Sequence, residues 1–430
     1  MTPPWPPYRL ATAALAALAP LAARWSPKLA QGLSGRRESA ERFAAWGAAE
    51  RDRSRPLLLL HAASAGELRQ AQPVLARLQA RQPAWQVAVT CFSPSGLPVL
   101  PALHADVAGL LPFDRPAAVA ALLDALAPSA IVYSRSDLWP ELVHAAAARG
   151  IPQGMIAATL PAESRRRRWP ARRVLRPALE RLAAVGAIAA DDAHRLTWLG
   201  ARPEAVSITG DPRYDAVIER LERSPAPVPT PATLVAGSTW PADEAVLLTA
   251  FAAVRETNPA ARLLIAPHEP TAAHLAGLAA RARAAGLPAP LEWTPAGLDA
   301  PLGVVTEVGG LALLYGTGQL AYVGGGFGRA GLHSVLEPAA CGVPVIVGPL
   351  GERNADALRL NAAGALSWLP RRRAAAILAA WWETWLVDAA WRRLAGANAR
   401  EAINGGRGAA DRSAALIERL MPTPMPASPP

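Results

Sequence analysis

The chain has 430 residues, of which 51% are hydrophobic, and this length is enough for two ordinary domains with full cores. Its 33 glycines and 43 prolines follow no collagen-like period and no cysteine–histidine spacing fits a zinc site, so fibrous and zinc-organised proteins are excluded. A net charge of +10, nearly all of it from arginine, favours anionic partners such as phosphates, nucleotides or acidic lipids.

Residues 1–30 carry a short apolar stretch, Leu10–Ala23, which Pro20 interrupts. The stretch is too short to span a bilayer, and aromatic residues such as Trp5 and Trp25 flank it. This pattern favours a segment that anchors the protein at an anionic membrane surface. A cleaved signal peptide and an ordinary helix packed on the domain stay open as alternatives.

From Pro56 onward, short apolar runs alternate with helical patterns rich in Ala and Leu. Strands with intervening helices indicate a parallel sheet, so residues 31–223 are predicted to form an α/β domain. We expect its strands at Leu57–His61, Gln86–Cys91, Ala130–Tyr133, Gln153–Ala157, Ala184–Ala189 and Val206–Ile208, and helices at Glu67–Ala80, Pro116–Ala125 and Leu138–Arg149.

A proline-rich segment without periodicity, 224–232, is interpreted as a linker to a second α/β domain over residues 233–420. The tail 421–430 is expected to be disordered. Two such Rossmann-like domains would face a cleft at the carboxyl ends of their parallel sheets. We expect the second set of strands at Thr233–Ala236, Ala261–Ala266, Gly303–Thr306, Leu320–Val323 and Val343–Val347, followed by helices at Ala374–Trp391 and Asn404–Leu420.

The densest motif, "AYVGGGFGRAGLHSVLEP", begins at Ala321. Glycines allow a backbone to approach phosphate closely, and Glu337 could hold ribose hydroxyls. The glycines at 326, 328 and 331 also fit the dinucleotide fingerprint, which would indicate an NAD-dependent oxidoreductase. That fingerprint normally opens a domain, whereas this one follows several strands, and tight turns would explain the glycines equally well.

Two further motifs follow strands and have a structural and a functional interpretation. In "AGSTWPADE", Ser238 or Thr239 could cap the next helix, with Asp243 and Glu244 in its first turn. In "HAASAGE", the spacing of Ser64 and Glu67 is that of a capping box. Alternatively, Glu67 is a general base in the cleft, where burial would raise its pKa.

The segment "ESRRRRWPARRVLRPALERL", which begins at Glu163, is the strongest charge feature. It is either a solvated surface or a contact with anionic lipid or a phosphorylated acceptor. Nucleic acid is not expected to be a partner, because aromatic residues do not interleave with the arginines in the way that base stacking requires.

From about Tyr8 to about Ala365, the chain resembles the bacterial 3-deoxy-D-manno-octulosonic acid (Kdo) transferases, which are lipid A glycosyltransferases of the GT-B fold. The number, order and spacing of short blocks carry this resemblance. The blocks are "HAASAGE", "LPFD" with Pro116, "LWPEL", "GIP", "ITGDPRYD", "AGST", "YVGGG", "LHSVLEPAA", "GVPVIVGP" and Asn354.

The resemblance implies a set of site residues. Glu67 corresponds to the catalytic base. The donor side would comprise Ser238, Thr239, His268, Gly324, Gly325, His333, Ser334, Glu337 and Asn354. The acceptor side would comprise Ser64, Gly66, Arg135, Asp137, Arg165 and Arg213.

Several positions depart from the family pattern. Arg135, Ser136 and Asp137 stand where the family has Glu-Thr-Glu, which reverses the first charge. An Asn-Ala-Arg-Leu block corresponds to residues 157–160, here Ala-Ala-Thr-Leu, and the family's Arg-His pair corresponds to His268 and Glu269. Ser334 replaces an asparagine. The first two departures fall on the acceptor side of the expected site, and the last two fall on the donor side.

The resemblance implies an inverting glycosyltransferase that moves Kdo, or a related acidic sugar, from CMP-Kdo to a lipid A precursor in lipopolysaccharide biosynthesis. It also implies no bound metal or other cofactor, and a location at the cytoplasmic face of the inner membrane. A nucleotide-sugar-binding relative that has lost transfer, or that uses another donor or acceptor, is the alternative; the oxidoreductase is a weaker one.

Overall fold

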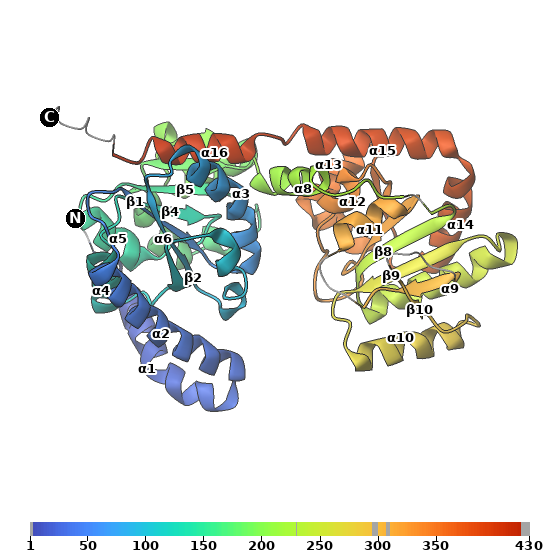
Figure 1. Cartoon of the computed structure of the whole chain (residues 1–430), viewed down its shortest axis with the longest axis horizontal. Helices are drawn as coiled ribbons and strands as arrows, with labels where there is room; N and C mark the ends of the chain where they lie inside the picture. The colour runs from blue at the N-terminus through green and yellow to red at the C-terminus, as the bar shows by residue number, and fades with distance from the viewer. Residues whose placement is uncertain (1–2, 229, 295–299, 307–309, 423–430) are drawn as a thin grey trace. The chain divides into compact units, whose positions relative to one another are not determined.

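The computed structural model describes residues 3–228, 230–294, 300–306 and 310–422. The chain divides into two compact units, which we call unit 1, up to Ala216 together with the residues from Gly408 onward, and unit 2, Val217–Arg407. Each unit is built on its own parallel sheet with helices on both faces (Figure 1). The predicted Rossmann-like α/β class is therefore confirmed for both.

Unit 1 contains a seven-stranded sheet in the order β3-β2-β1-β4-β5-β6-β7, with every pairing parallel. Its strands are β1 (Leu57–Ala62), β2 (Gln86–Cys91), β3 (Val107–Leu110), β4 (Ala130–Ser134), β5 (Gln153–Ala158), β6 (Ala184–Ala187) and β7 (Val206–Ile208). Its α-helices are α1 (Pro6–Ala22), α2 (Pro27–Ala49), α3 (Ala65–Arg81), α4 (Pro116–Leu126), α5 (Pro140–Ala148), α6 (Ala171–Leu179), α7 (Ala190–Leu199) and α16 (Ala409–Glu418), while α8 (Pro212–Glu222) crosses into unit 2.

The central strand β1 explains why the sheet is covered on both faces. Successive side chains of a strand point to opposite faces, and all six residues of β1 are buried. Leu57 and Leu59 pack into one hydrophobic cluster and Leu58 and Leu60 into the other. A run of leucines therefore specifies a fully buried central strand, which positions the loop that follows it.

The C-terminal helix corrects the predicted domain boundary. The sequence interpretation placed residues up to 420 in the second domain, but α16 packs against α3 of unit 1 (Figure 1). Ala410, Ala414 and Ile417 join the same cluster as Leu58. Met421 is buried in that cluster, and the remainder of the predicted disordered tail, 423–430, lies outside the described residues.

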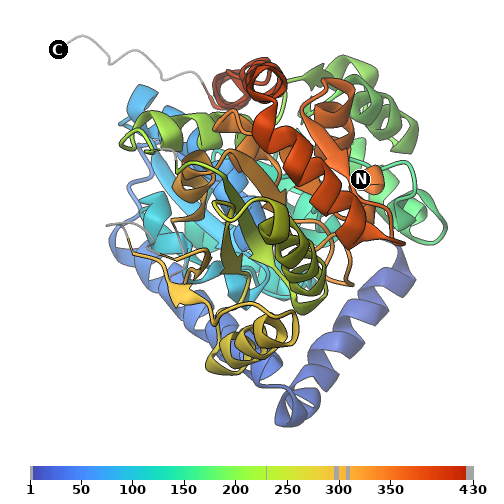
Figure 2. The same ribbon diagram turned by 90° about the vertical axis from the view of Figure 1, so that its right-hand side faces the viewer.

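The N-terminal helices α1 and α2 are joined by the short 3₁₀ segment Ala23–Trp25 and meet at an angle (Figure 2). The start of α1 is tied to unit 1, because Tyr8 donates a hydrogen bond to Asp114 and Arg9 forms two to Glu141. Farther along, Leu10, Leu15 and Leu18 are exposed. Within the described residues, no helix has the length and apolarity needed to cross a bilayer.

Unit 2 contains a second seven-stranded parallel sheet, in the order β10-β11-β9-β8-β12-β13-β14. Its strands are β8 (Thr233–Thr239), β9 (Arg262–Pro267), β10 (Leu291–Glu292), β11 (Leu302–Val304), β12 (Leu320–Val323), β13 (Val345–Val347) and β14 (Leu366–Trp368). Its helices are α9 (Pro241–Thr257), α10 (Ala272–Ala284), α11 (Leu311–Thr317), α12 (Leu336–Ala340), α13 (Ala355–Ala362), α14 (Ala374–Val387) and α15 (Ala389–Asn404).

The helices after residue 374 differ from the prediction. Ala374–Trp391 was expected to be one helix, but the chain breaks at Asp388, whose side chain accepts a hydrogen bond from the Trp391 backbone and caps α15. α14 carries the buried Trp382, which stacks on Phe251 of α9 at 5.5 Å. An apolar pattern predicts these helices but not the capping aspartate between them.

Candidate active site

The loop between β1 and α3 presents the predicted base of unit 1. β1 ends in His61 and Ala62, Ser64 is extended, and Glu67 lies in the first turn of α3. Glu67 is partly buried, whereas Gly66 beside it is exposed. Because this loop leaves the carboxyl end of a central parallel strand, it occupies the position where such sheets bind ligands.

The expected capping box is formed only in part. The Glu67 Oε2 atom accepts a hydrogen bond of 2.7 Å from the backbone N–H of Ala63, one residue before the cap. Ser64 is the N-cap residue, but its side chain makes no capping hydrogen bond. The carboxylate is thus fixed at one oxygen without the reciprocal serine contact that defines the motif.

Burial sets the charge behaviour of Glu67. It raises the pKa of this carboxyl above the ordinary 4.5, and the Asp137 charge raises it further. The hydrogen bond from Ala63 and the charges of Arg135 and His61 act in the opposite direction. A carboxylate with a raised pKa is a stronger base than an exposed one, which suits proton abstraction from a hydroxyl near neutral pH.

A hydrogen-bonded cluster surrounds His61, which is fully buried. Trp139 Nε1 donates to His61 Nε2 and to Asp137 Oδ2, both at 3.0 Å. Since Nε2 accepts, Nδ1 carries the proton and donates to Thr90 Oγ1 at 3.0 Å. Arg166 contacts Asp137 at 3.6 Å. The structure therefore brings the predicted Asp137 to the same sheet edge as Glu67, and it adds Trp139, which the sequence interpretation did not assign to the site.

Two residues that depart from the family pattern have a left-handed backbone conformation. Arg135, directly after β4, has φ of 65°, and Ala157, in β5, has φ of 50°. Non-glycine residues are strained there, and such strain gathers at functional sites. The Arg135 side chain is exposed, and its charge lowers the pKa of Glu67 where an acid would raise it.

The remaining acceptor-side residues are placed differently. Arg165 borders a hollow of about 770 Å³ that is also lined by Asp137 and Trp139. Arg213, at the start of α8, binds Asp211, which in turn accepts a hydrogen bond from Gln70 of α3. Arg213 is thus linked to α3 through Asp211. Arg165 lies beside the hydrogen-bonded group of His61, Trp139 and Asp137, which we call the Asp137 cluster.

In unit 2, three aromatic rings meet where β8, β9 and β12 end. Trp240 follows β8, His268 follows β9, and His333 lies in the loop after β12. The rings of His268 and His333 are 4.2 Å apart and those of Trp240 and His268 are 5.1 Å apart. Trp240 Nε1 donates to His333 Nε2 at 3.0 Å. The structure brings the two predicted histidines together and adds Trp240, which the sequence interpretation missed although it follows "AGST".

Asp243 links the two loops that carry these rings. Its Oδ1 accepts a hydrogen bond from the Tyr322 hydroxyl at 2.8 Å. Its Oδ2 accepts from the backbone N–H of Gly325 at 2.9 Å and of Trp240 at 3.0 Å. Burial raises the pKa of this carboxyl. The expected first-turn position is confirmed, and the contacts also give Asp243 a bridging role between strands.

The capping role expected for Ser238 or Thr239 is wrong. Trp240 is the N-cap residue of α9, and the buried Thr239 hydroxyl donates to Glu244 inside the unit. Glu244 also binds His274 at 2.7 Å and Arg281. Ser238 has φ of 52°, a third strained residue at a strand end.

The loop after β12 needs glycine at two positions. A Cβ on Gly324 would lie 2.2 Å from the Ser238 carbonyl oxygen. Gly325 has φ of 88°, and a Cβ there would lie 1.9 Å from the carbonyl oxygen of Gly331. The dinucleotide interpretation is wrong, because this loop follows the fifth strand of unit 2 along the chain and α12 begins only at Leu336.

Burial is the main cause that lowers the pKa of His333 to about 4, and the neighbouring His268 lowers it further. A neutral His333 fits the hydrogen bond that it accepts from Trp240. Glu337, in the first turn of α12, has a pKa raised by burial and binds Arg220 at 3.1 Å. Ser334 and Asn354 have local roles, since Ser334 accepts from the Leu336 N–H and Asn354 caps α13.

Comparison with known proteins identifies the family of this chain. A family model described as 3-deoxy-D-manno-octulosonic-acid transferase (kdotransferase) matches residues 37–216. The chain is 31% identical to the 3-deoxy-D-manno-octulosonic acid transferase of Bordetella pertussis, over 85% of this chain and 88% of that protein. It is 27% identical to the Haemophilus influenzae enzyme of the same name, over 68% and 70% of the two chains.

Solved structures with little sequence similarity share the fold. UDP-GlcNAc 2-epimerase from Neisseria meningitidis matches with a TM-score of 0.61 at 14% identity, covering 84% of this chain and all of that one. A glycosyltransferase of kitacinnamycin matches with a TM-score of 0.56 at 17% identity, covering 86% of this chain and all of that one.

The two Rossmann-like units, each with a parallel sheet covered by helices, have the architecture of the GT-B fold class. Sequence identity to the relatives named above then assigns the family: the chain belongs to the 3-deoxy-D-manno-octulosonic acid transferase family, whose members are glycosyltransferases.

Proposed function

We propose that this glycosyltransferase moves Kdo from CMP-Kdo to a hydroxyl of a lipid A precursor, with inversion at the anomeric carbon, in lipopolysaccharide biosynthesis. The observation that carries the proposal is Glu67, a partly buried carboxylate fixed at one oxygen at the carboxyl end of β1. An inverting transfer needs a base within hydrogen-bond reach of the incoming hydroxyl, and Glu67 supplies one with a raised pKa.

The loops of unit 2 form the proposed donor site. Backbone N–H groups in the glycine loop and the neutral His333 would receive the phosphate of CMP, and Glu337 would hold ribose hydroxyls. Asp243 supports this assignment, because it fixes the glycine loop and Trp240 to one another before any ligand arrives. Such preorganisation reduces the ordering cost of binding.

The proposed setting is the cytoplasmic face of the inner membrane, where the protein would be held peripherally. The exposed leucines of α1 and the exposed Trp25 support an interfacial helix, since apolar side chains otherwise face water. We also propose that the reaction uses no metal or other cofactor besides the activated sugar. Excess chelator should then leave the transfer rate unchanged.

A second candidate is a family member that binds a nucleotide sugar but has lost transfer, or that uses another donor or acceptor. The observation that favours it is Arg135, whose positive charge lowers the pKa of Glu67 at a position where the family motif that this sequence resembles has an acid. This charge stabilises the ionised base but would repel a cationic group and attract an anionic one.

Incubating the purified protein with CMP-Kdo and lipid A precursor tests the proposal directly. Mass spectrometry of the lipid should show added Kdo, with CMP released in equal amount. Binding of CMP without transfer would refute the proposed function and support the second candidate.

A further inference from the structure

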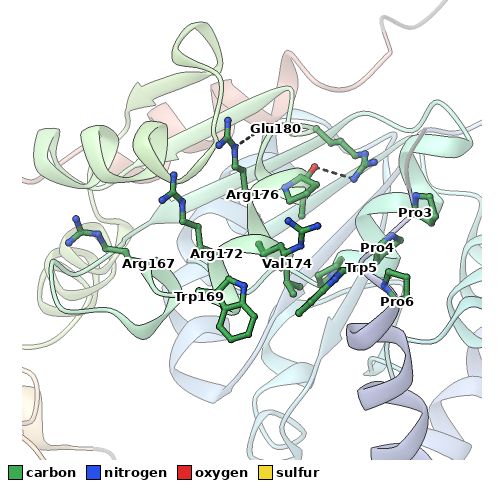
Figure 3. A pocket seen from close by; sticks show the side chains of 15 residues that line it. Pro3, Pro4, Trp5, Pro6, Arg167, Trp169, Arg172, Val174, Arg176 and Glu180 are labelled. Carbon is green, nitrogen blue, oxygen red and sulfur yellow. Dashed lines mark hydrogen bonds and ion pairs between the residues drawn. The ribbon is translucent and has the colours of Figure 1, made fainter.

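Two adjoining hollows lie in unit 1 between the N-terminal segment and the residues from Arg165 to Arg181. Figure 3 shows the first of them. They share four wall residues, which are Trp5, Pro140, Trp169 and Val174. The rings of Trp5 and Trp169 meet edge to face with centroids 6.3 Å apart, and Trp169 is 75% exposed. An exposed tryptophan that borders both hollows offers an apolar surface that a ligand in either hollow could contact.

The first, which we call the arginine hollow, measures about 660 Å³ and carries a concentrated positive charge. Its lining includes Arg167, Arg172, Arg173, Arg176 and Arg181. Among the described residues, the lining contains a single carboxylate, that of Glu180, which forms an ion pair with Arg176 at 2.9 Å. Within the part of the chain that the structure describes, Arg172 and Arg173 have no acidic partner. Arg172 instead lies 4.3 Å from the ring of Trp198, and Arg173 lies 5.7 Å from that of Trp5.

The arrangement of these guanidinium groups suits a phosphate. Arginine binds phosphate oxygens with paired, charge-assisted hydrogen bonds, and rings that hold the guanidinium plane reduce the ordering cost. A carboxylate ligand would also be attracted, but it carries one charge, whereas Arg172 and Arg173 alone offer two. A doubly charged phosphomonoester matches this excess better.

The second, the apolar hollow, measures about 770 Å³ and is lined mainly by apolar side chains, among them Ala11, Leu138 and Leu175. At one side it reaches Trp139 and Asp137, the residues that surround His61. A hydrocarbon chain would gain free energy by leaving water for these walls. Arg165, Arg166 and Arg168 line it as well and give it a charged border.

We propose that the two hollows together bind one amphiphile, with its phosphate in the arginine hollow and an acyl chain in the apolar hollow. The occupant is the phosphorylated, acylated acceptor, because the apolar hollow adjoins the Asp137 cluster beside Glu67. This inference rests on the proposed function for the identity of the occupant.

Calorimetric titration of the full-length protein tests the proposal with three probes: inorganic phosphate, dodecyl phosphate below its micelle concentration, and dodecyl maltoside. Dodecyl phosphate should bind most tightly, and lengthening the alkyl chain should tighten it by up to about fourfold for each CH₂ group buried. The variant Arg172→Gln/Arg173→Gln should weaken it by about tenfold to a hundredfold. Trp169→Ala should weaken dodecyl phosphate but not inorganic phosphate.

Matched controls separate the site from general charge and hydrophobicity. Arg371 and Arg372 are an exposed pair in unit 2, so Arg371→Gln/Arg372→Gln removes the same charge elsewhere and should not change binding. Leu394 is a large exposed apolar residue of unit 2, so Leu394→Ala is the control for Trp169→Ala. Equal losses in variant and control would overturn the proposal.

Other outcomes also decide the proposal. If dodecyl phosphate binds no better than inorganic phosphate, the apolar hollow does not take the chain and the proposal is wrong. If the Arg172→Gln/Arg173→Gln variant loses binding to phosphatidylglycerol vesicles but keeps dodecyl phosphate, the arginines serve the bilayer surface instead. A wild type that binds dodecyl phosphate as expected but transfers nothing from CMP-Kdo would uphold the site and refute the proposed function.

Discussion

Glu67 accepts a hydrogen bond from the backbone N–H of Ala63 at 2.7 Å, and this contact fixes the carboxylate without the serine contact of a full capping box. Burial nevertheless raises its pKa, so ionisation of Glu67 is less favourable in the folded protein than in the unfolded chain. For an acid with a raised folded pKa, stability is complete at low pH and is lost as pH rises through the folded value.

The variant Glu67→Gln should therefore unfold at the same or a slightly higher temperature than wild type at neutral pH. Glutamine can still accept the Ala63 hydrogen bond while the cost of a buried charge disappears. Differential scanning calorimetry measures the change, with the exposed Glu38→Gln as control. A clear loss of stability would show that Glu67 serves mainly to cap α3.

Asp243→Ala should destabilise unit 2 by about 3 kcal/mol, because the buried donors of Tyr322, Gly325 and Trp240 lose their acceptor. The same variant should bind CMP more weakly, since the two loops are no longer fixed to one another. Urea unfolding and a CMP titration measure the two effects. Glu256→Ala, on the exposed side of α9, is the control and should change neither.

His333 should make stability depend on pH in a defined interval. Its pKa is lowered from the ordinary 6.5 to about 4, so the unfolded chain binds a proton that the folded protein does not. The free energy of unfolding should therefore fall as pH decreases from about 6.5 to about 4. His333→Gln should make this slope shallower, whereas the exposed His194→Gln should leave it unchanged. An identical slope in both variants would contradict the lowered pKa.

Glu337→Ala should weaken CMP binding by about tenfold, the usual loss for hydrogen bonds to a charged group. The carboxylate is partly buried in the first turn of α12 and is held by Arg220. Fluorescence titration with CMP and with cytosine base measures the loss, which should be confined to CMP because the ribose is the proposed contact. Glu352→Ala, exposed nearby in sequence, is the control; equal affinity in both proteins would remove Glu337 from the donor site.

Local patterns predicted the elements that carry the site. The leucines of β1, the glycine loop at Gly324 and Gly325, and the order of strands and helices are readable because each depends on neighbours in sequence. Short strands such as β3 and β14 were missed, since three or four residues give too little periodicity to detect.

The errors involve contacts between distant residues. The apolar residues of α16 predict a helix, but not that Ala410 and Ile417 cover the sheet of unit 1. Asp243 looks like an ordinary first-turn acid, yet its partners Tyr322 and Gly325 lie 79 and 82 residues away. The short spacing between Trp240 and Asp243 can be read from the sequence, whereas the pairing of Asp243 with residues of a distant strand cannot.

The proposed mechanism depends on Glu67 acting as the base of sugar transfer. The most direct measurement is the initial rate of transfer from CMP-Kdo to lipid A precursor by wild type and Glu67→Gln, on preparations of equal melting temperature. If Glu67 is the base, Glu67→Gln should lose turnover by about 10²–10⁴-fold with CMP affinity unchanged. The wild-type rate should also fall as acid protonates Glu67, at a pH above the ordinary carboxyl pKa of 4.5. A Glu67→Gln protein with the full wild-type rate would contradict this role.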